Sequence, residues 1–191
     1  MFYRIAITGP ESTGKSLLTA RLAQMFRTSY VNEFARDYID AFDRPYQYED
    51  LLSIAQGQIA SEDEAAKNAT RILFCDTELT VIKIWSEVRY EKCDHRIIDL
   101  LNNRSYDLYL VMDVDLPWEY DPQREHPGFR PQLLEMYIQE MKNRSLPWEL
   151  VSGDGPDRLL NALNHIYRHF PELESVILND KIPQINIFPH D

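Results

Sequence analysis

The chain has 191 residues, 44% of them apolar and 27% charged, and its formal net charge is −11 at pH 7. These proportions predict one globular domain, and the acidity argues against duplex nucleic acid and anionic lipid as partners, because both attract clustered Lys and Arg. No apolar run reaches the roughly 18 residues of a membrane span, and the N-terminus does not resemble a signal peptide, so we expect a cytoplasmic protein.

The first part of the chain predicts strands that alternate with helices. An apolar run over Tyr3–Thr8 predicts the first strand. The next helix is expected from apolar residues at helical spacing, namely Leu18, Leu22, Met25 and Phe26. A second strand is expected over Tyr30–Ala35, a long helix over Glu49–Lys67, and a third strand, buried on both faces, over Arg71–Asp76.

The alternation continues to residue 170. Two shorter helices are expected over Leu79–Val88 and Asp94–Leu101, and a fourth strand over Asp107–Asp113. After a long loop come a helix, a fifth strand and a last helix, around residues 134–141, 148–153 and 159–170. This order predicts an α/β fold with a five-stranded parallel sheet and helices on both faces.

We therefore expect one domain over residues 1–170, followed by a C-terminal tail over residues 171–191. The tail is too apolar for a free terminus, so it is expected to pack on its own domain. Docking on a second copy, and hence a homo-oligomer, is the alternative.

The stretch "GPESTGKS", Gly9–Ser16, matches the phosphate-binding P-loop pattern G-x-x-x-x-G-K-[ST]. A glycine turn that merely starts a helix is the alternative, but the preceding strand and following helix favour the P-loop. Its backbone N–H groups would face the β-phosphate of ATP, Lys15 would bridge the β- and γ-phosphates, and Ser16 would hold Mg²⁺. The predicted ATP-binding residues here are Gly9, Glu11, Ser12, Thr13, Gly14, Lys15, Ser16 and Leu17.

Asp76 and Asp113 each end an apolar strand, where a magnesium-organising carboxylate belongs in a P-loop fold. Thr77 and Glu78 follow Asp76 and make the denser polar cluster, so we predict Asp76 and Ser16 as metal ligands and Glu78 as a substrate ligand. For Asp113, a turn or helix-cap role explains the residue better.

Three charged residues follow the second strand: Glu33, Arg36 and Asp37. A carboxylate at this place could accept the proton of an attacking hydroxyl, and Arg36 could bind the acceptor. Glu33 and Asp37 are both candidates for this base and for acceptor binding. A salt-bridged, exposed helix start is an equally good explanation of the mixed charges.

The loop over residues 114–131 is rich in proline and carries Arg124 and Arg130. Such a loop could close as a lid over the triphosphate and neutralise charge in the transition state. We predict Arg124 as catalytic and Arg130 as an ATP ligand, although ordinary surface arginines are the alternative. Trp85 could stack on a base, but aromatic residues more often belong to the core.

Five stretches occur in an order and spacing that resemble the kinase domain of NadR-type ribosylnicotinamide kinases: "GPESTGKS", "NEFARDY", "IAQGQIASEDEAA", "ILFCDTE" and "PWEYDPQREH". The likeness runs from about Ile5 to Phe170. It implies an adenylate-kinase-like fold and a magnesium-dependent transfer of the ATP γ-phosphate to the 5′-hydroxyl of nicotinamide riboside, giving nicotinamide mononucleotide for NAD salvage.

The resemblance also implies roles for individual residues. Glu33 would contact the acceptor, Asp76 would organise magnesium, and Arg124 would touch the phosphates from the lid. The chain has Asn32 where that family carries a tryptophan, and it lacks the family's DNA-binding and adenylyltransferase regions, so we expect a kinase-like protein acting alone. A kinase for another nucleoside or metabolite and a regulatory nucleotide-switch ATPase are the alternatives.

Overall fold

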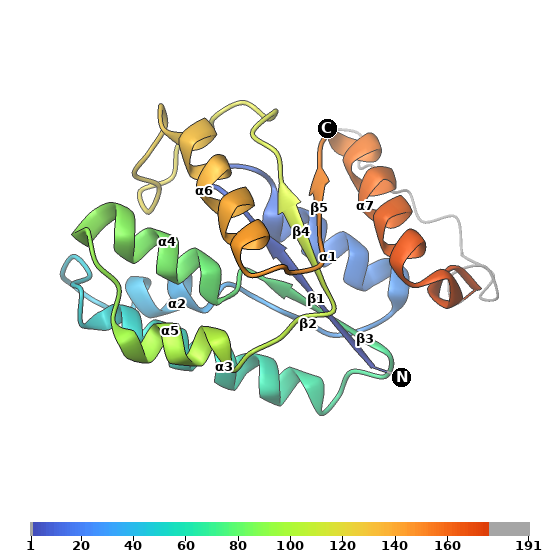
Figure 1. Cartoon of the computed structure of the whole chain (residues 1–191), viewed down its shortest axis with the longest axis horizontal. Helices are drawn as coiled ribbons and strands as arrows, with labels where there is room; N and C mark the ends of the chain where they lie inside the picture. Colours follow the sequence, from blue (N-terminus) through green and yellow to red (C-terminus); the bar gives the residue numbers. More distant parts are fainter. Residues whose placement is uncertain (1, 176–191) are drawn as a thin grey trace.

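The computed structural model describes residues 2–175 and has a five-stranded sheet in the order β2-β3-β1-β4-β5, with every neighbouring pair parallel (Figure 1). The strands are β1 Tyr3–Thr8, β2 Tyr30–Val31, β3 Ile72–Asp76, β4 Leu108–Met112 and β5 Trp148–Val151. The predicted five-stranded parallel α/β fold is confirmed.

Helices cover both faces of this sheet (Figure 1). They are α1 Lys15–Phe26, α2 Phe34–Asp40, α3 Asp50–Ala66, α4 Leu79–Tyr90, α5 His95–Asn102, α6 Arg130–Asn143 and α7 Gly155–His169, followed by the short 3-10 helix η1 Pro171–Leu173. Within residues 2–175, none of these helices combines the length and the apolar character that crossing a membrane requires.

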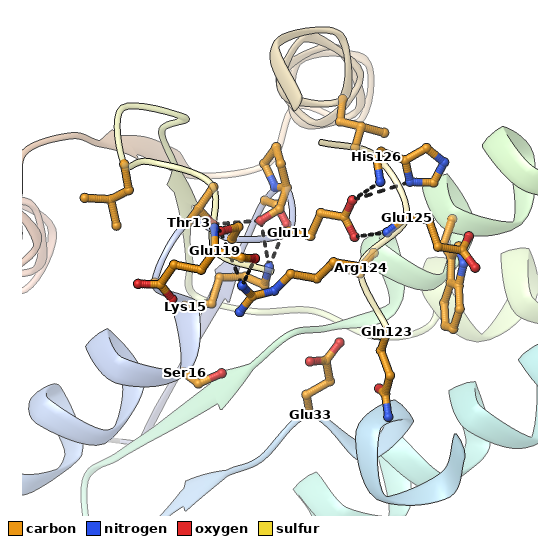
Figure 2. A pocket seen from close by; sticks show the side chains of 18 of the residues that line it. Glu11, Thr13, Lys15, Ser16, Glu33, Glu119, Gln123, Arg124, Glu125 and His126 are labelled. Atoms are coloured by element: carbon orange, nitrogen blue, oxygen red, sulfur yellow. Dashed lines mark hydrogen bonds and ion pairs between the residues drawn. The ribbon is translucent and has the colours of Figure 1, made fainter. Parts of the chain in front are cut away.

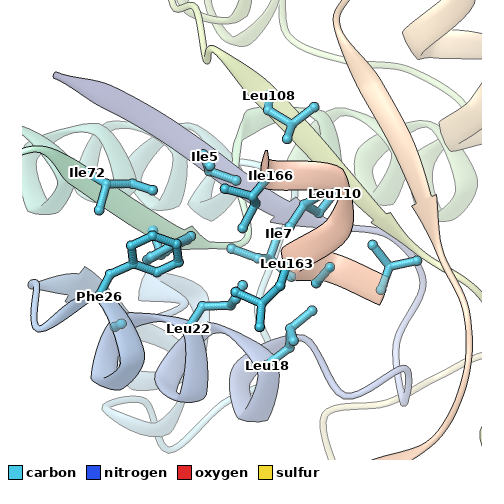
Figure 3. Packing of buried hydrophobic residues seen from close by; sticks show 14 of the residues in the cluster. Ile5, Ile7, Leu18, Leu22, Phe26, Ile72, Leu108, Leu110, Leu163 and Ile166 are labelled. Carbon is cyan, nitrogen blue, oxygen red and sulfur yellow. The ribbon is translucent and has the colours of Figure 1, made fainter. Parts of the chain in front are cut away.

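The core divides by the alternation of side chains along the strands. Ile5 and Ile7 of β1 point to the face covered by α1 and α7, where they pack with Leu22 and Ile166 (Figure 3). Ala6, the residue between them, faces the opposite layer, which includes α6. Burial of both faces explains why the central strands are apolar throughout.

The register of the strands brings the polar strand ends together. Ile7 of β1 pairs with Asp76 of β3, so Asp76 lies beside the point where β1 runs into Gly9–Ser16. In open parallel sheets, ligands bind at the carboxyl ends of the strands, next to the strand at which the order reverses. Here β1 is that strand, since β3 lies on one side of it and β4 on the other.

Two predicted boundaries were wrong. The second strand ends at Val31 instead of Ala35, because α2 begins at Phe34 and the exposed Asn32 and extended Glu33 form the connection. The loop after β4 is also shorter, because α6 begins at Arg130 with a proline in its first turn, a position that proline favours.

The start of the C-terminal tail packs on the domain. Leu173 of η1 is 2% exposed and belongs to the same core cluster as Ile5 and Leu22. Residues 176–191, the rest of the predicted tail, lie outside the described residues. The prediction that they pack on the domain or on a partner therefore falls outside the described part of the chain.

The carboxylate of Glu62, a residue of α3, is buried and is held by hydrogen bonds from two neighbouring side chains. Its Oε2 accepts a hydrogen bond from Arg104 Nη2 (2.8 Å) and its Oε1 accepts one from Tyr106 Oη (2.7 Å). Burial raises the pKa of Glu62, and the positive charge of Arg104 opposes that rise.

We expect Arg104→Met to lower the free energy of unfolding by about 3–5 kcal/mol at neutral pH, because it leaves Glu62 as an uncompensated buried charge. A carboxyl whose folded pKa is raised destabilises the fold as pH rises through that pKa, so the loss should shrink in acid, where Glu62 takes up a proton. Urea unfolding at pH 5 and pH 7.5 measures both effects. Arg96→Met, which removes an exposed partner of Asp94, is the control and should change stability little; equal losses in the two variants would contradict this account.

Candidate active site

The loop Gly9–Ser16 connects β1 to α1 in the conformation of a phosphate cradle. Gly14 caps α1 with φ 78° and Ser12 has φ 56°, so left-handed residues alternate with others along the loop. Such alternation turns successive backbone N–H groups toward a common centre, where an anion binds. Gly9 is required for close packing, since a Cβ there would lie 3.0 Å from the backbone nitrogen of Met112.

Lys15 belongs to this loop and lines the cavity (Figure 2). Its Nζ donates hydrogen bonds to the carbonyl oxygens of Gly9 (3.1 Å) and Pro10 (2.8 Å). Burial lowers the pKa of Lys15, while the negative charges of Glu33 and Asp76 oppose that change. The ammonium is therefore close enough to both carboxylates to interact with their charge.

Asp76 and Ser16 fit a magnesium site. Asp76 is 3% exposed, and its Oδ1 is buried without a hydrogen-bond partner among the described residues. Burial raises the pKa of Asp76 to about 6, against a hydrogen bond with Ser16 and the charge of Lys15. A hydrated Mg²⁺ would satisfy the unpaired oxygen. Residues 2–175 contain no cluster of three or more His, Cys, Asp or Glu suited to a metal. Mg²⁺ is usually bound through one or two carboxylates plus phosphates and water.

Asp113, the other strand-end candidate, is engaged in a turn. Its Oδ1 accepts a hydrogen bond from the backbone nitrogen of Val114 (2.8 Å) and its Oδ2 accepts one from Ser152 Oγ (2.8 Å). Both oxygens are thus satisfied by protein groups, unlike Asp76 Oδ1.

Asp76→Asn is therefore expected to raise the Mg²⁺ concentration needed for half-maximal nucleotide binding by about 10- to 100-fold. Mutation of groups that surround a bound metal usually lowers metal affinity by this factor. Titrating Mg²⁺ against a fluorescent ATP analogue measures the shift directly. Asp113→Asn is the matched control, a strand-end aspartate whose loss should leave the titration unchanged. Chelation of the metal should abolish turnover in every variant. A normal Mg²⁺ titration for Asp76→Asn would remove this residue from the metal site.

Glu33 reaches the same cavity from the opposite wall (Figure 2). It precedes α2 with extended backbone, and its side chain makes no capping hydrogen bond to that helix. The carboxylate is therefore available to a ligand. Asp37, the competing candidate, is exposed on α2 and is not among the described residues that line the cavity. The structure thus brings together Lys15 and Glu33 but leaves Asp37 outside.

The loop after β4 is tied to α2 on one side. Arg36 Nη1 forms an ion pair with Asp121 Oδ2 (2.9 Å), and Arg36 also lines the cavity. Gln123 Nε2 donates to Asp40 Oδ1 (2.5 Å). Arg36 thus both lines the cavity and binds the loop after β4.

On the other side, the lid is tied to the P-loop (Figure 2). Ser12 Oγ accepts a hydrogen bond from the backbone nitrogen of Glu119 (2.9 Å), and the Glu11 carboxylate accepts the backbone N–H groups of Glu125 (3.1 Å) and His126. Arg124, next to Glu125, donates to the Glu119 carbonyl (2.6 Å). These contacts join the loop after β4 to the P-loop and bring Arg124 Nη1 within 3.4 Å of Ser12 Oγ.

The structure places two predicted ligands away from the cavity. Arg130 is the first residue of α6, and its guanidinium donates to the carbonyl oxygens of Ser12 (2.9 Å) and Leu116 (3.0 Å), so it braces the P-loop from outside. Glu78 is fully buried, and its carboxylate caps α4 by accepting a hydrogen bond from the Thr80 backbone nitrogen (2.7 Å) and accepts another from Thr8 Oγ1 (2.9 Å). Neither is among the cavity-lining residues in the described part of the chain.

The cavity has a volume of about 580 Å³, within the usual range for small-molecule sites. Part of its wall is apolar, formed by Ala35, Ile39, Val81, Ile84, Trp85 and Val88, and the polar residues Arg36, Gln123, Glu125 and His126 also line the cavity. The Trp85 indole is fixed there, because its Nε1 donates to Tyr46 Oη (2.7 Å). The apolar part of the wall suits the face of a flat ring, and the part formed by Gly9–Ser16 suits phosphates.

Arg158 of α7 was missed from the sequence. Its Nη1 donates to the Thr13 carbonyl (2.9 Å), and its guanidinium pairs with Asp115 at the base of the lid. No local pattern marks it, because its partner lies 145 residues away in the chain. The lid contacts of Glu119 and Gln123 were missed for the same reason.

Comparison with known proteins agrees with this geometry. A family model described as an AAA domain matches residues 4–158, most of the chain. The chain belongs to this AAA-domain family. The trifunctional NAD biosynthesis/regulator protein NadR of Salmonella typhimurium is 31% identical over 143 residues, which cover 69% of this chain and 35% of that protein. The chain thus spans about a third of the curated relative it matches.

Solved structures give the same picture of the fold. A NadR protein in complex with NR has a TM-score of 0.77 at 18% identity, covering 97% of this chain and 53% of that one. A deoxyadenosine kinase from M. mycoides with bound products has a TM-score of 0.64 at 16% identity, covering 86% and 99%. The predicted resemblance to a NadR-type P-loop domain is confirmed.

Proposed function

We propose that the protein is an ATP- and Mg²⁺-dependent kinase that phosphorylates the 5′-hydroxyl of nicotinamide riboside. One observation carries the proposal: Lys15 in the P-loop and Glu33 across from it line a single cavity, which Arg124 covers and Trp85 bounds at its apolar end. A hydrolase that activates water would not need an apolar end of this kind.

The chemistry assigned to these residues is an in-line phosphoryl transfer. Glu33 orients the acceptor hydroxyl and takes its proton as the oxygen–phosphorus bond forms and the bond from the γ-phosphorus to the β–γ bridging oxygen breaks. Lys15 and Arg124 neutralise the charge on the transferred group and on departing ADP. Mg²⁺, held through Ser16 and Asp76, would neutralise and orient the phosphates. The closed lid excludes water, which competes with the acceptor.

The choice of nicotinamide riboside rests on charge and shape. Its pyridinium ring is a fixed cation, and the cavity wall offers the indole of Trp85, whose face attracts a flat cation. Asn32, which replaces a tryptophan of the NadR-type pattern, is exposed and lies outside the described lining. Trp85 would supply the missing aromatic surface. The structural neighbour with bound NR supports the same acceptor by analogy.

A neutral nucleoside is the second candidate acceptor. It is favoured by the structural likeness to the deoxyadenosine kinase, of which the match covers 99%. Such a substrate would use the same Glu33 and P-loop chemistry and differ only at the apolar end.

ADP release from MgATP distinguishes these candidates when nicotinamide riboside, deoxyadenosine, thymidine and no acceptor are compared. We expect nicotinamide riboside to stimulate turnover most strongly and the Lys15→Ala variant to show no stimulation. Stimulation by deoxyadenosine instead would keep the mechanism and change the acceptor. Equal, slow hydrolysis with and without every acceptor would overturn the kinase and favour a nucleotide-switch ATPase.

A further inference from the structure

The block "IAQGQIASEDEAA" lies on α3 and contributes no predicted catalytic residue, yet two of its residues contact the segment that carries Glu33. Gln58 of α3 is 1% exposed, and its Oε1 accepts a hydrogen bond from the backbone nitrogen of Phe34 (3.0 Å). Phe34 directly follows Glu33. The buried amide of Gln58 therefore holds the peptide group that joins Glu33, the proposed base, to Phe34.

The other end of the same amide holds the metal side of the site. Gln58 Nε2 donates to the carbonyl oxygen of Thr77 (3.3 Å), the residue after Asp76. It also donates to Glu62 Oε1 (3.4 Å), one turn further along α3. The orientation of the amide is fixed, because the Phe34 N–H needs an acceptor while the Thr77 carbonyl and the Glu62 carboxylate need a donor.

Gly57 makes a second, independent contact with Phe34. A Cβ at Gly57 would lie 2.1 Å from Cε1 of the Phe34 ring, so the ring rests directly on the backbone of α3. Gly57 fixes the Phe34 side chain, and Gln58 fixes its backbone. Glycine normally weakens a helix interior, and at this position it leaves room for that ring.

We propose that the Gly57–Gln58 pair is a positioning device that sets the distance between Glu33 and Asp76, and hence between the acceptor hydroxyl and the magnesium-bound phosphate. The inference rests on the proposed kinase function. Neither residue is among the described residues that line the cavity, so they act through Phe34 and Thr77. The Gln58 amide is bonded both to the segment after Glu33 and to the residue after Asp76. Misplacement of a reacting group by about 1 Å lowers rates by about 10²-fold.

The test compares Gln58→Met with Gln56→Met, a matched change at an exposed glutamine two residues earlier on the same helix. We expect Gln58→Met to lower kcat/KM for the acceptor by about 10²-fold. At saturating Mg²⁺ the KM for ATP should change less than about twofold, since the P-loop is untouched. Gln56→Met should match the wild type. Gly57→Ala should give the same kinetic signature as Gln58→Met, although glycine-to-alanine changes usually favour helices. Each rate is divided by the fraction of the protein that binds nucleotide, so that a smaller amount of folded protein does not appear as a slower reaction.

A readout that does not need turnover is the exchange of the Phe34 amide proton by NMR with MgATP bound. It should be protected in the wild type and in Gln56→Met, and should exchange at least tenfold faster in Gln58→Met. Unchanged Phe34 exchange, or acceptor kinetics that equal the wild type per folded molecule, would overturn the inference. If the wild type itself turns over no acceptor, the proposed function fails, and the exchange experiment still decides whether Gln58 holds the Glu33 segment.

Discussion

Glu33→Gln is expected to lower acceptor-dependent turnover by about 10²–10⁴-fold, the range attributed to a positioned general base. The amide keeps the size of the side chain but cannot take the hydroxyl proton. Affinity for MgATP should stay within about twofold of the wild type, because Glu33 lies across the cavity from the P-loop backbone that binds the phosphates. Rapid-quench measurement of ADP formation, with nucleotide affinity measured separately, gives both numbers.

Asp37→Asn is the matched control for this prediction. Asp37 carries the same charge four residues further on, but it is exposed and not one of the described cavity-lining residues. Its loss should leave turnover almost unchanged. If Asp37→Asn were the damaging variant and Glu33→Gln were not, the base would have to be reassigned and α2 would have to move on substrate binding.

Arg124→Ala is expected to lower kcat by about 10³–10⁵-fold, the effect of removing an arginine that stabilises phosphoryl-transfer charge. Its guanidinium already lies over the P-loop, bonded to Glu119 and within 3.4 Å of Ser12 Oγ. The KM for the acceptor should change far less than kcat, because the arginine contacts the transferred group and not the acceptor ring.

Two further variants separate this role from general disturbance of the lid. Tyr120→Ala alters an 86% exposed lid side chain and should leave kcat unchanged. Arg124→Lys keeps the charge but not the planar donor geometry, and should recover only part of the loss. If Arg124→Ala raised the KM for ATP with kcat intact, Arg124 would bind ATP equally in the ground and transition states and would not be catalytic.

The glycine and lysine pattern at Gly9–Ser16 could be read directly from the sequence, because all its parts are contiguous and a predicted strand and helix flank them. The apolar strands could also be predicted from the sequence, since a strand buried on both faces must be apolar throughout. From these two features followed the parallel sheet and the position of the site at its carboxyl edge. The prediction that Asp76 is a metal ligand came from its place at a strand end.

Tertiary structure alone separated Glu33 from Asp37. Four residues apart, they would share a face of a regular helix, but Glu33 precedes α2 with ψ 106° and so points elsewhere. Glu78 and Arg130 were misjudged for a related reason. Each is close in sequence to the site, yet local backbone groups, at the start of α4 and along the P-loop, take up their polar atoms.

The lid contacts and the buried amide of Gln58 required the fold itself. Gln58 joins Phe34 to Thr77 across 24 and 19 residues of chain, and Arg124 meets Ser12 across 112. Local propensity and periodicity describe a residue and its near neighbours, and say nothing about which distant backbone groups will be buried without a partner. The sequence alone therefore determined the phosphate-binding chemistry of this protein, while packing decided which carboxylate and arginine face it.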